Sequence, residues 1–189
     1  MNLLVHICCG VCFAAILEDL KSRDFSFTGF FYNPNIHPLI EFRRRLKALK
    51  VLLEGEKIKV IYDENYGLKD FLREVNWEGR RCPDCYCLRL KRAAEVAKDH
   101  GFSAFTTTLL TSPHQHHLLI RRIGEEVGEE AGVSFAYFDF RGLHKHSLEL
   151  AKKKGLYRQK YCGCIFSEYE RFADTTLHFY RGLAGRRTW

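Results

Sequence analysis

The cysteines of this chain fall into three tight groups, and they are the residues whose type and spacing are best suited to chemistry. The 189-residue sequence has eight of them: Cys8, Cys9 and Cys12, then Cys82, Cys85 and Cys87, then Cys162 and Cys164. Cysteines used only as small core side chains would scatter with the apolar pattern, whereas thiolates that bind a metal or exchange electrons must converge from short-spaced pairs. The grouping indicates metal binding or redox chemistry.

The second group contains a Cys-x-x-Cys pair, Cys82 and Cys85. Two thiolates at this spacing can bind one metal ion or one edge of a cluster, because the intervening turn brings both sulfurs to the same side. The alternative without metal binding is that the pair only marks the start of a helix, with one of its thiols buried. Cys87 is expected on the following helix, where a role in the core is as compatible with the pattern as a ligand role.

The first group contains adjacent cysteines, whose side chains would point apart on an extended strand. Cys8 and Cys9 can reach one centre only where the strand has ended and the chain turns, which Gly10 permits. We therefore favour Cys8 and Cys9 as ligands. Cys12 could approach the same site or pack in the core, and the sequence leaves this open.

The third group, Cys162-Gly163-Cys164, is too tight for an ordinary structural zinc site. Two thiols separated by one glycine can form a strained, easily reduced disulfide, as a pair that handles two electrons requires. The alternative is that they complete a metal site. Because zinc is redox-silent, the additional pair favours iron and sulfur as the cofactor of the other cysteines.

Short apolar runs alternate with longer segments of helical periodicity and would position these groups. Strands are predicted at 3–7, 27–32, 57–62, 104–107 and 135–138, and helices at 12–23, 39–53, 68–75, 86–100, 117–131 and 167–180. This alternation predicts an α/β fold with a parallel sheet of about five strands and helices on both faces. With no linker or repeat, we expect a single domain over 1–189, with a helical C-terminal segment at about 167–189.

Polar, turn-rich segments follow the predicted strands, which places the cysteine motifs at the C-terminal rim of the sheet. In parallel sheets, ligands bind outside the carboxyl ends of the strands. Cys8 and Cys9 follow the strand at 3–7, and a segment that ends in His114 and Gln115 follows the strand at 104–107. The first pair would also lie near a helix N-terminus, which favours thiolate.

The charge balance is basic, with 30 lysines and arginines against 23 acidic residues and a formal net charge of +7. This indicates a polyanionic partner, although a solvated surface explains the charge alone equally well. Short basic runs at 43–45 and 80–81, at 152–154 and at 186–187 tip the balance toward an anionic substrate. No leader pattern or membrane span is evident, so we expect a cytoplasmic protein without disulfides that only stabilise the fold.

Five motifs in order resemble the QueH family and span residues 6–164. They are His6-Ile7-Cys8-Cys9-Gly10-Val11-Cys12, the segment 33–38 with sequence NPNIHP, Cys82-Pro83-Asp84-Cys85-Tyr86 with Arg89-Leu90, the segment 107–115, and the segment 157–164 with sequence YRQKYCGC. The resemblance implies a Rossmann-like (HUP-type) fold and epoxyqueuosine reductase activity, the last step of queuosine synthesis at the tRNA wobble position, without cobalamin. One departure is Val11, where the family pattern has proline.

The resemblance also implies roles for individual residues. Carried over by position, Cys8, Cys9, Cys82 and Cys85 match the ligands of a [4Fe-4S] cluster, and Cys162 with Cys164 match a redox-active disulfide. A further iron ion next to the cluster is compatible with the family. The implied partners are tRNA that carries epoxyqueuosine and an electron donor that the sequence does not identify, with no membrane.

Two rival interpretations come from other functional classes. An ATP-using, iron–sulfur tRNA-thiolating enzyme would need a glycine- and serine-rich phosphate loop after the first strand, where Cys8, Cys9 and Gly10 stand instead. A zinc-stabilised RNA-binding module would use the same cysteines without catalysis. Metal analysis and an absorbance spectrum separate the second rival from an iron–sulfur enzyme.

Overall fold

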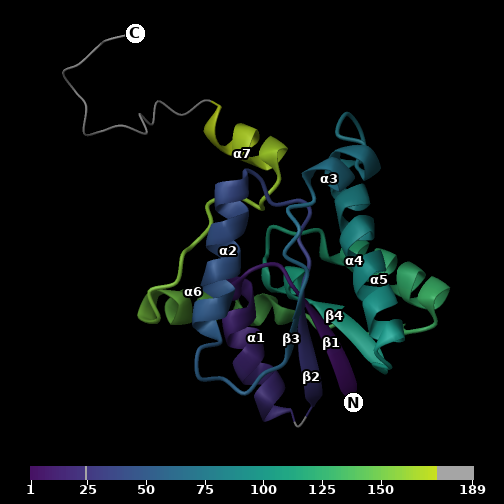
Figure 1. Ribbon diagram of the computed structural model, residues 1–189, viewed down its shortest axis with the longest axis vertical. Coiled ribbons are helices and arrows are strands. Elements are labelled where there is room, and N and C mark those ends of the chain that lie inside the picture. The colour runs from purple at the N-terminus through teal and green to yellow at the C-terminus, as the bar shows by residue number, and fades with distance from the viewer. Residues whose placement is uncertain (24, 174–189) are drawn as a thin grey trace.

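The chain is built around a five-stranded, all-parallel sheet. The computed structural model describes residues 1–23 and 25–173, and its strands are ordered β3-β2-β1-β4-β5 (Figure 1). Their bounds are β1 Asn2–Ile7, β2 Ser26–Phe31, β3 Val60–Tyr62, β4 Ala104–Thr107 and β5 Ser134–Phe135. The strand order reverses between β1 and β4, so the crevice expected to hold a ligand lies outside the carboxyl ends of these two strands.

Helices cover both faces of the sheet. Figure 1 shows α1, α2 and α6 on one side and α4 and α5 on the other, with α3 and α7 beyond the carboxyl end. The helix bounds are α1 Gly10–Ser22, α2 Leu39–Leu52, α3 Leu68–Glu74, α4 Arg81–Asp99, α5 His117–Ala131, α6 His144–Lys153 and α7 Ile165–Phe172. Two 3₁₀ helices, η1 Thr108–Thr111 and η2 Phe140–Leu143, complete the described elements.

The central strand has no polar face. Leu3, Leu4, Val5 and Ile7 of β1 are all fully buried, because helices pack against both sides of a parallel sheet. In the described residues, no helix combines the length and apolar character needed to cross a bilayer. The predicted α/β class, parallel sheet and two-sided helical covering are confirmed.

Two helix predictions are corrected by the structure. The helix expected to begin at residue 86 begins at Arg81, so the Cys-x-x-Cys pair lies within α4 rather than in a turn before it. Pro83 is compatible with this start, because the first turn of a helix has no intrahelical acceptors for its N–H groups. Helix α6 was not predicted, since its buried face is made of the small residues Ser147 and Ala151 rather than an apolar stripe.

Two other elements differ in extent. The strand predicted at 135–138 is only Ser134–Phe135. The helix predicted at 167–180 begins earlier, as α7, and the part of that prediction after residue 173 lies outside the described residues, as does most of the predicted helical segment at 167–189.

Candidate metal and redox site

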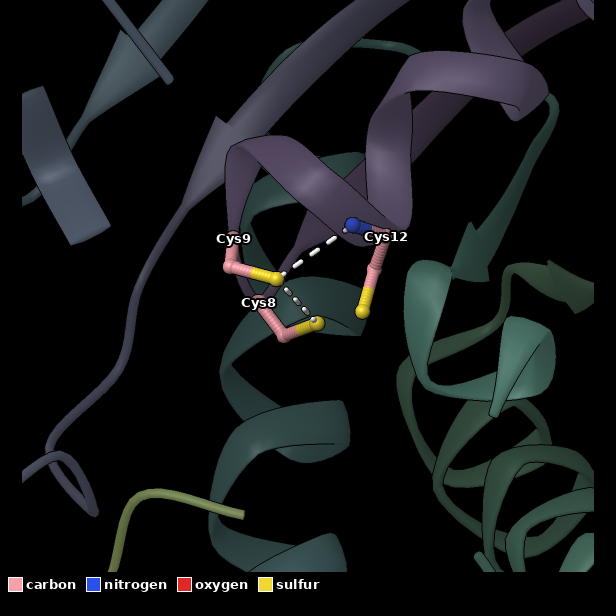
Figure 2. A group of neighbouring side chains, drawn as sticks. All are labelled: Cys8, Cys9 and Cys12. Carbon is pink, nitrogen blue, oxygen red and sulfur yellow. Dashed lines mark hydrogen bonds between the residues drawn. The ribbon is translucent and has the colours of Figure 1, made fainter. Parts of the chain in front are cut away.

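Three sulfurs converge where β1 ends and α1 begins. The Sγ atoms of Cys8, Cys9 and Cys12 all lie within 4.8 Å of one another, and those of Cys8 and Cys9 are 3.8 Å apart (Figure 2). Cys9 is the N-cap of α1, and its sulfur accepts a hydrogen bond of 3.3 Å from the Cys12 N–H. The position of Cys12, which the sequence left open, is therefore beside the pair.

Contacts from neighbouring strand ends hold this turn in place. The Cys8 N–H donates to Thr108 Oγ1 at 2.9 Å, and the Thr108 hydroxyl donates to Cys8 Sγ at 3.1 Å. Asn33 Nδ2, after β2, donates to the Ile7 carbonyl at 2.9 Å. Residues that follow three adjacent strands thus fix where the adjacent cysteines point.

The environment favours one thiolate in this group. Hydrogen bonds from Cys12 and Cys9 hold the pKa of Cys8 well below its usual value, against the effect of burial, with help from the Arg89 charge and Thr108. The pKa of Cys12 is raised by hydrogen bonding with Cys8 and Cys9 and by burial. Converging thiols are soft ligands that suit zinc, copper(I) or iron–sulfur centres, so this group could hold a metal.

The second cysteine group lies on α4 and is not part of the three-sulfur group. Cys82 and Cys85, one helical turn apart, are half-buried, and burial raises the pKa of Cys85 to about 11 while the Arg89 charge opposes this. Cys85 packs against a buried cluster that contains Phe71 and Cys164. In the described part of the chain, Cys8, Cys9 and Cys12 form the one group of three potential ligands within 4.8 Å.

Cys87 points away from both other groups. It is exposed and lines a separate cavity, together with Tyr32 and Arg92. Its exclusion from the site stays a prediction.

The third group forms a pair of free thiols at the start of α7. The Sγ atoms of Cys162 and Cys164 are 3.9 Å apart, and Cys164 caps α7 by accepting from the Ser167 N–H at 3.4 Å. Gly163 has a φ of 133°, and a Cβ there would lie within 3.2 Å of Arg45 and Asn35 side-chain nitrogens. Glycine thus lets the two thiols face each other while the backbone passes close to its neighbours.

A buried ion pair fastens this segment to α2. Arg45 Nε donates to Glu41 Oε1 at 2.7 Å, and its two terminal nitrogens donate to the carbonyls of Cys162 and Tyr161 at 2.8 and 3.0 Å. The Tyr157 hydroxyl donates to the other Glu41 oxygen at 2.5 Å. Both partners of the ion pair are buried, so the third cysteine group has a rigid support.

A cavity of about 620 Å³ joins the first and third groups. Cys8, Cys12 and Cys162 line it, as do His114, His144, Arg158, Gln159, Lys160 and Arg171. Gln159 Nε2 donates to Cys9 Sγ at 3.0 Å and thus links the segment before Cys162 to the first group. Ser147 and His144, which lie on the unpredicted helix α6 and line the same cavity, were not predicted as site residues.

The basic runs and histidines of the sequence motifs lie in different environments in the structure. Arg45 and Arg81 belong to the predicted basic runs but are ion-paired with Glu41 and Glu170, so they do not offer free positive charge. The Lys152–154 run lies exposed at the end of α6, and residues 186–187 lie outside the described residues. His37 is buried between Tyr66 and Phe71, while His114 lines the cavity.

Comparisons with known proteins identify the same family that the five sequence motifs resemble. A profile of the family described as epoxyqueuosine reductase QueH matches residues 3–170. A Dehalococcoides mccartyi protein of that name is 38% identical over 173 residues, which cover 90% of this chain and 94% of that protein. A Thermotoga maritima protein of the same name is 34% identical over 181 residues, 90% of this chain and 92% of that protein. The chain therefore belongs to the epoxyqueuosine reductase QueH family, a family of oxidoreductases.

Proposed function

We propose that this protein reduces epoxyqueuosine in tRNA to queuosine, without cobalamin. The observation that carries the proposal is the single cavity that exposes Cys8 and Cys12 on one side and Cys162 on the other. A volume of about 620 Å³ is in the range of small-molecule sites and suits one extruded nucleotide. The cysteines proposed to bind the metal centre and the Cys162–Cys164 dithiol would then face the same substrate.

The donor set fits an iron–sulfur centre. Cys8, Cys9, Cys82 and Cys85 are the proposed ligands of a [4Fe-4S] cluster, and the position of Cys12 makes it a candidate for a further iron ion. Such a centre, when bound, supplies single electrons and Lewis acidity toward an oxygen atom. Burial of Cys8 and Cys9 would keep water away from it.

The thiols at Cys162 and Cys164 can balance the reaction. Removing the epoxide oxygen as water and leaving an alkene takes two electrons and two protons. When the pair becomes a disulfide it releases two electrons and the proton of Cys164, and the second proton comes from solvent. Hydrogen bonding from Cys164, then Ser167, lowers the pKa of Cys162 to about 5 against the effect of burial, while Cys164 keeps its proton. An external reductant, not identified by the sequence, would return the disulfide to the dithiol.

Basic side chains at the cavity suit a tRNA substrate. Arg158, Lys160 and Arg171 are exposed, and no ion pair among the described residues includes them. Free cations at the mouth of a nucleotide-sized cavity would hold the phosphates that flank the extruded base. A tRNA-modifying role is consistent with the expected cytoplasmic location.

The test is an anaerobic assay on epoxyqueuosine-containing tRNA, with iron and sulfide measured in the same preparation. We expect queuosine to form, and Cys162→Ser and Cys164→Ser to retain the cluster absorbance but to stop after at most one turnover. Zinc without iron in active-site thiols would support an RNA-binding module instead. Loss of the cluster in either serine variant would show that the third pair is a ligand rather than a redox pair.

A further inference from the structure

Two arginines of the described chain are almost fully buried, and they differ in their counter-charge. Arg45 is 2% exposed and pairs with the buried Glu41 at 2.7 Å. Arg89, on α4, is 3% exposed, and no carboxylate within salt-bridge distance is found for it among residues 1–23 and 25–173. Its Nη2 donates to Asn33 Oδ1 at 2.8 Å, while its buried Nε has no hydrogen-bond partner.

A buried guanidinium needs a negative neighbour. Arginine remains protonated in proteins, and a charge removed from water is costly unless an opposite charge or a metal centre compensates it. The Asn33 amide supplies a hydrogen bond but no charge. The compensating charge for Arg89 must therefore come from another group nearby.

The groups around Arg89 are the cysteines of the first two groups. Arg89 lies one helical turn after Cys85 on α4 and acts on its thiol both as a charge and as a hydrogen-bond donor. Its charge also acts on Cys8. Asn33 bridges Arg89 to the Ile7 carbonyl, directly before Cys8, so one hydrogen-bonded chain ties α4 to the end of β1.

The neighbouring histidine does not alter this charge balance. His6 is fully buried, with Nδ1 2.8 Å from Thr107 Oγ1 and Nε2 3.0 Å from the Tyr32 carbonyl. Burial, and then the Arg89 charge, lower the pKa of His6 to about 3, so its ring is neutral at neutral pH. His6 therefore adds no positive charge beside Arg89.

We propose that Arg89 is the built-in counter-charge of the metal–sulfur centre bound between Cys8 and Cys85, and that it sets the reduction potential of that centre. The proposal rests on the proposed function. Net charge and hydrogen bonds to sulfur determine the potentials of iron–sulfur centres. A fixed positive charge favours the reduced form, which carries one more negative charge, and so raises the potential.

Two substitutions at this position separate charge from hydrogen bonding. Arg89→Gln removes the charge but keeps an amide that can donate to Asn33 Oδ1, and Arg89→Lys keeps the charge. The matched control is Arg92→Gln, which removes an exposed positive charge from the same helix, three residues after Arg89. Circular dichroism of each metal-free variant establishes that it folds.

The readouts are the midpoint potential of the reconstituted protein and the rise in Tm when iron and sulfide are loaded. In Arg89→Gln we expect a more negative potential and a smaller rise in Tm, because a centre that binds only the folded state stabilises it less when it binds more weakly. In Arg89→Lys and in Arg92→Gln, both quantities should stay close to those of the wild type.

Each alternative result has a distinct meaning. An unchanged potential and an unchanged Tm rise in Arg89→Gln overturn the role of Arg89 but leave the proposed function intact. Equal shifts in Arg89→Lys and Arg89→Gln show that geometry rather than charge matters, and also overturn it. If the wild type takes up no iron and sulfide, the proposed metal centre fails, and the role of Arg89 fails with it.

Discussion

Hydrogen bonding makes the two thiols of the third group unequal. The Cys164 thiol, and then Ser167, stabilise the thiolate of Cys162 and lower its pKa to about 5 from an ordinary 9.0, although burial acts in the opposite direction. Hydrogen bonding with Cys162 and burial raise the pKa of Cys164. At neutral pH, Cys162 is thus the thiolate of the pair and Cys164 the protonated thiol.

This inequality predicts the pH dependence of alkylation. In reduced, metal-free protein, the rate at which iodoacetamide modifies Cys162 should reach half its plateau near pH 5, measured by peptide mass spectrometry. Cys164→Ala should move this midpoint toward alkaline pH by removing the hydrogen bond. Cys87, whose pKa is raised by burial, is the internal control. A Cys162 that reacts only in the same alkaline range as Cys87 would contradict the assignment.

The place of Cys12 beside Cys8 and Cys9 predicts that it contributes to metal binding. Cys12→Ser should lower the iron content per chain after anaerobic reconstitution, because a hydroxyl is a much poorer ligand for soft metal centres than a thiolate. Cys87→Ser, which changes an exposed thiol on the other side of α4, should retain the wild-type content. Full iron content in Cys12→Ser would assign Cys12 to packing alone.

At the scale of the elements, the contact between α1 and α2 positions the first cysteine group. Gly10 is the first residue of α1, and a Cβ built on it would lie 2.8 Å from the Ala48 carbonyl oxygen and 2.9 Å from its carbon. These are backbone atoms of α2, which cannot move aside as a flexible side chain could. The close approach of the helices therefore requires glycine directly after Cys9.

Gly10→Ala should consequently affect both stability and metal binding. We expect the free energy of unfolding of the metal-free protein to fall by about 1–3 kcal/mol, as for overpacked cores, and the iron content to fall because α1 carries Cys9 and Cys12. Urea unfolding and iron analysis measure the two effects. Gly142→Ala, where a Cβ meets nothing within 4 Å, is the control. Equal stability of the two variants would show that α1 can shift without cost.

At the scale of the whole molecule, two buried histidines should limit stability in acid. Burial, and then the Arg89 charge, lower the pKa of His6 to about 3, and burial lowers that of His37 to about 4, from an ordinary 6.5. Below pH 6.5 the unfolded chain binds a proton at each position, whereas the folded chain does not until its own lower pKa is reached. Stability therefore falls as the pH drops below 6.5, by about 1.4 kcal/mol per pH unit for each histidine.

His37→Leu isolates one of these contributions. Among the residues that the structure describes, neither ring nitrogen of His37 has a hydrogen-bond partner, so leucine leaves no side-chain acceptor or donor unpaired. Urea unfolding between pH 6.5 and 5 should give a slope of stability against pH that is shallower than that of the wild type by about 1 kcal/mol per unit, because the unfolded histidine is only partly protonated near pH 6.5. Leu118→Gln, at an exposed and uncharged position of α5, should keep the wild-type slope. Parallel slopes for wild type and His37→Leu would contradict the prediction.

The basic cavity mouth predicts salt-dependent binding of tRNA. Replacing Arg158, Lys160 and Arg171 together by glutamine should reduce the slope of log affinity against log salt by about 2, from about 0.7 for each contact to a single-stranded phosphate. Filter binding or fluorescence anisotropy across a salt series measures this slope. Lys98→Gln, an exposed change at the far end of α4, should leave it unaltered. A slope that is equal in the triple variant and the wild type would place the phosphates elsewhere.

The sequence by itself determined the cysteine grouping, the alternation of strands and helices, and the location of the first cysteines at a strand end. These features depend on spacing over a few residues, which fixes the local period and the order of the elements. It could not place α6, because the face of that helix which packs on α1 consists of small residues, nor the true start of α4, because Pro83 reads equally as a turn or as a first helical turn.

Only the tertiary structure decided which distant side chains meet. Thr108 reaches Cys8 across 100 residues, Gln159 reaches Cys9 across 150, and Arg45 fastens the Cys162 segment from within a run that reads as solvated surface. The position of Cys12 beside Cys8 and Cys9 and the burial of Arg89 against Asn33 also depend on the tertiary structure. Such contacts depend on how the helices pack across the sheet, and the burial of a charged side chain follows from its partners in space rather than from its neighbours in the chain.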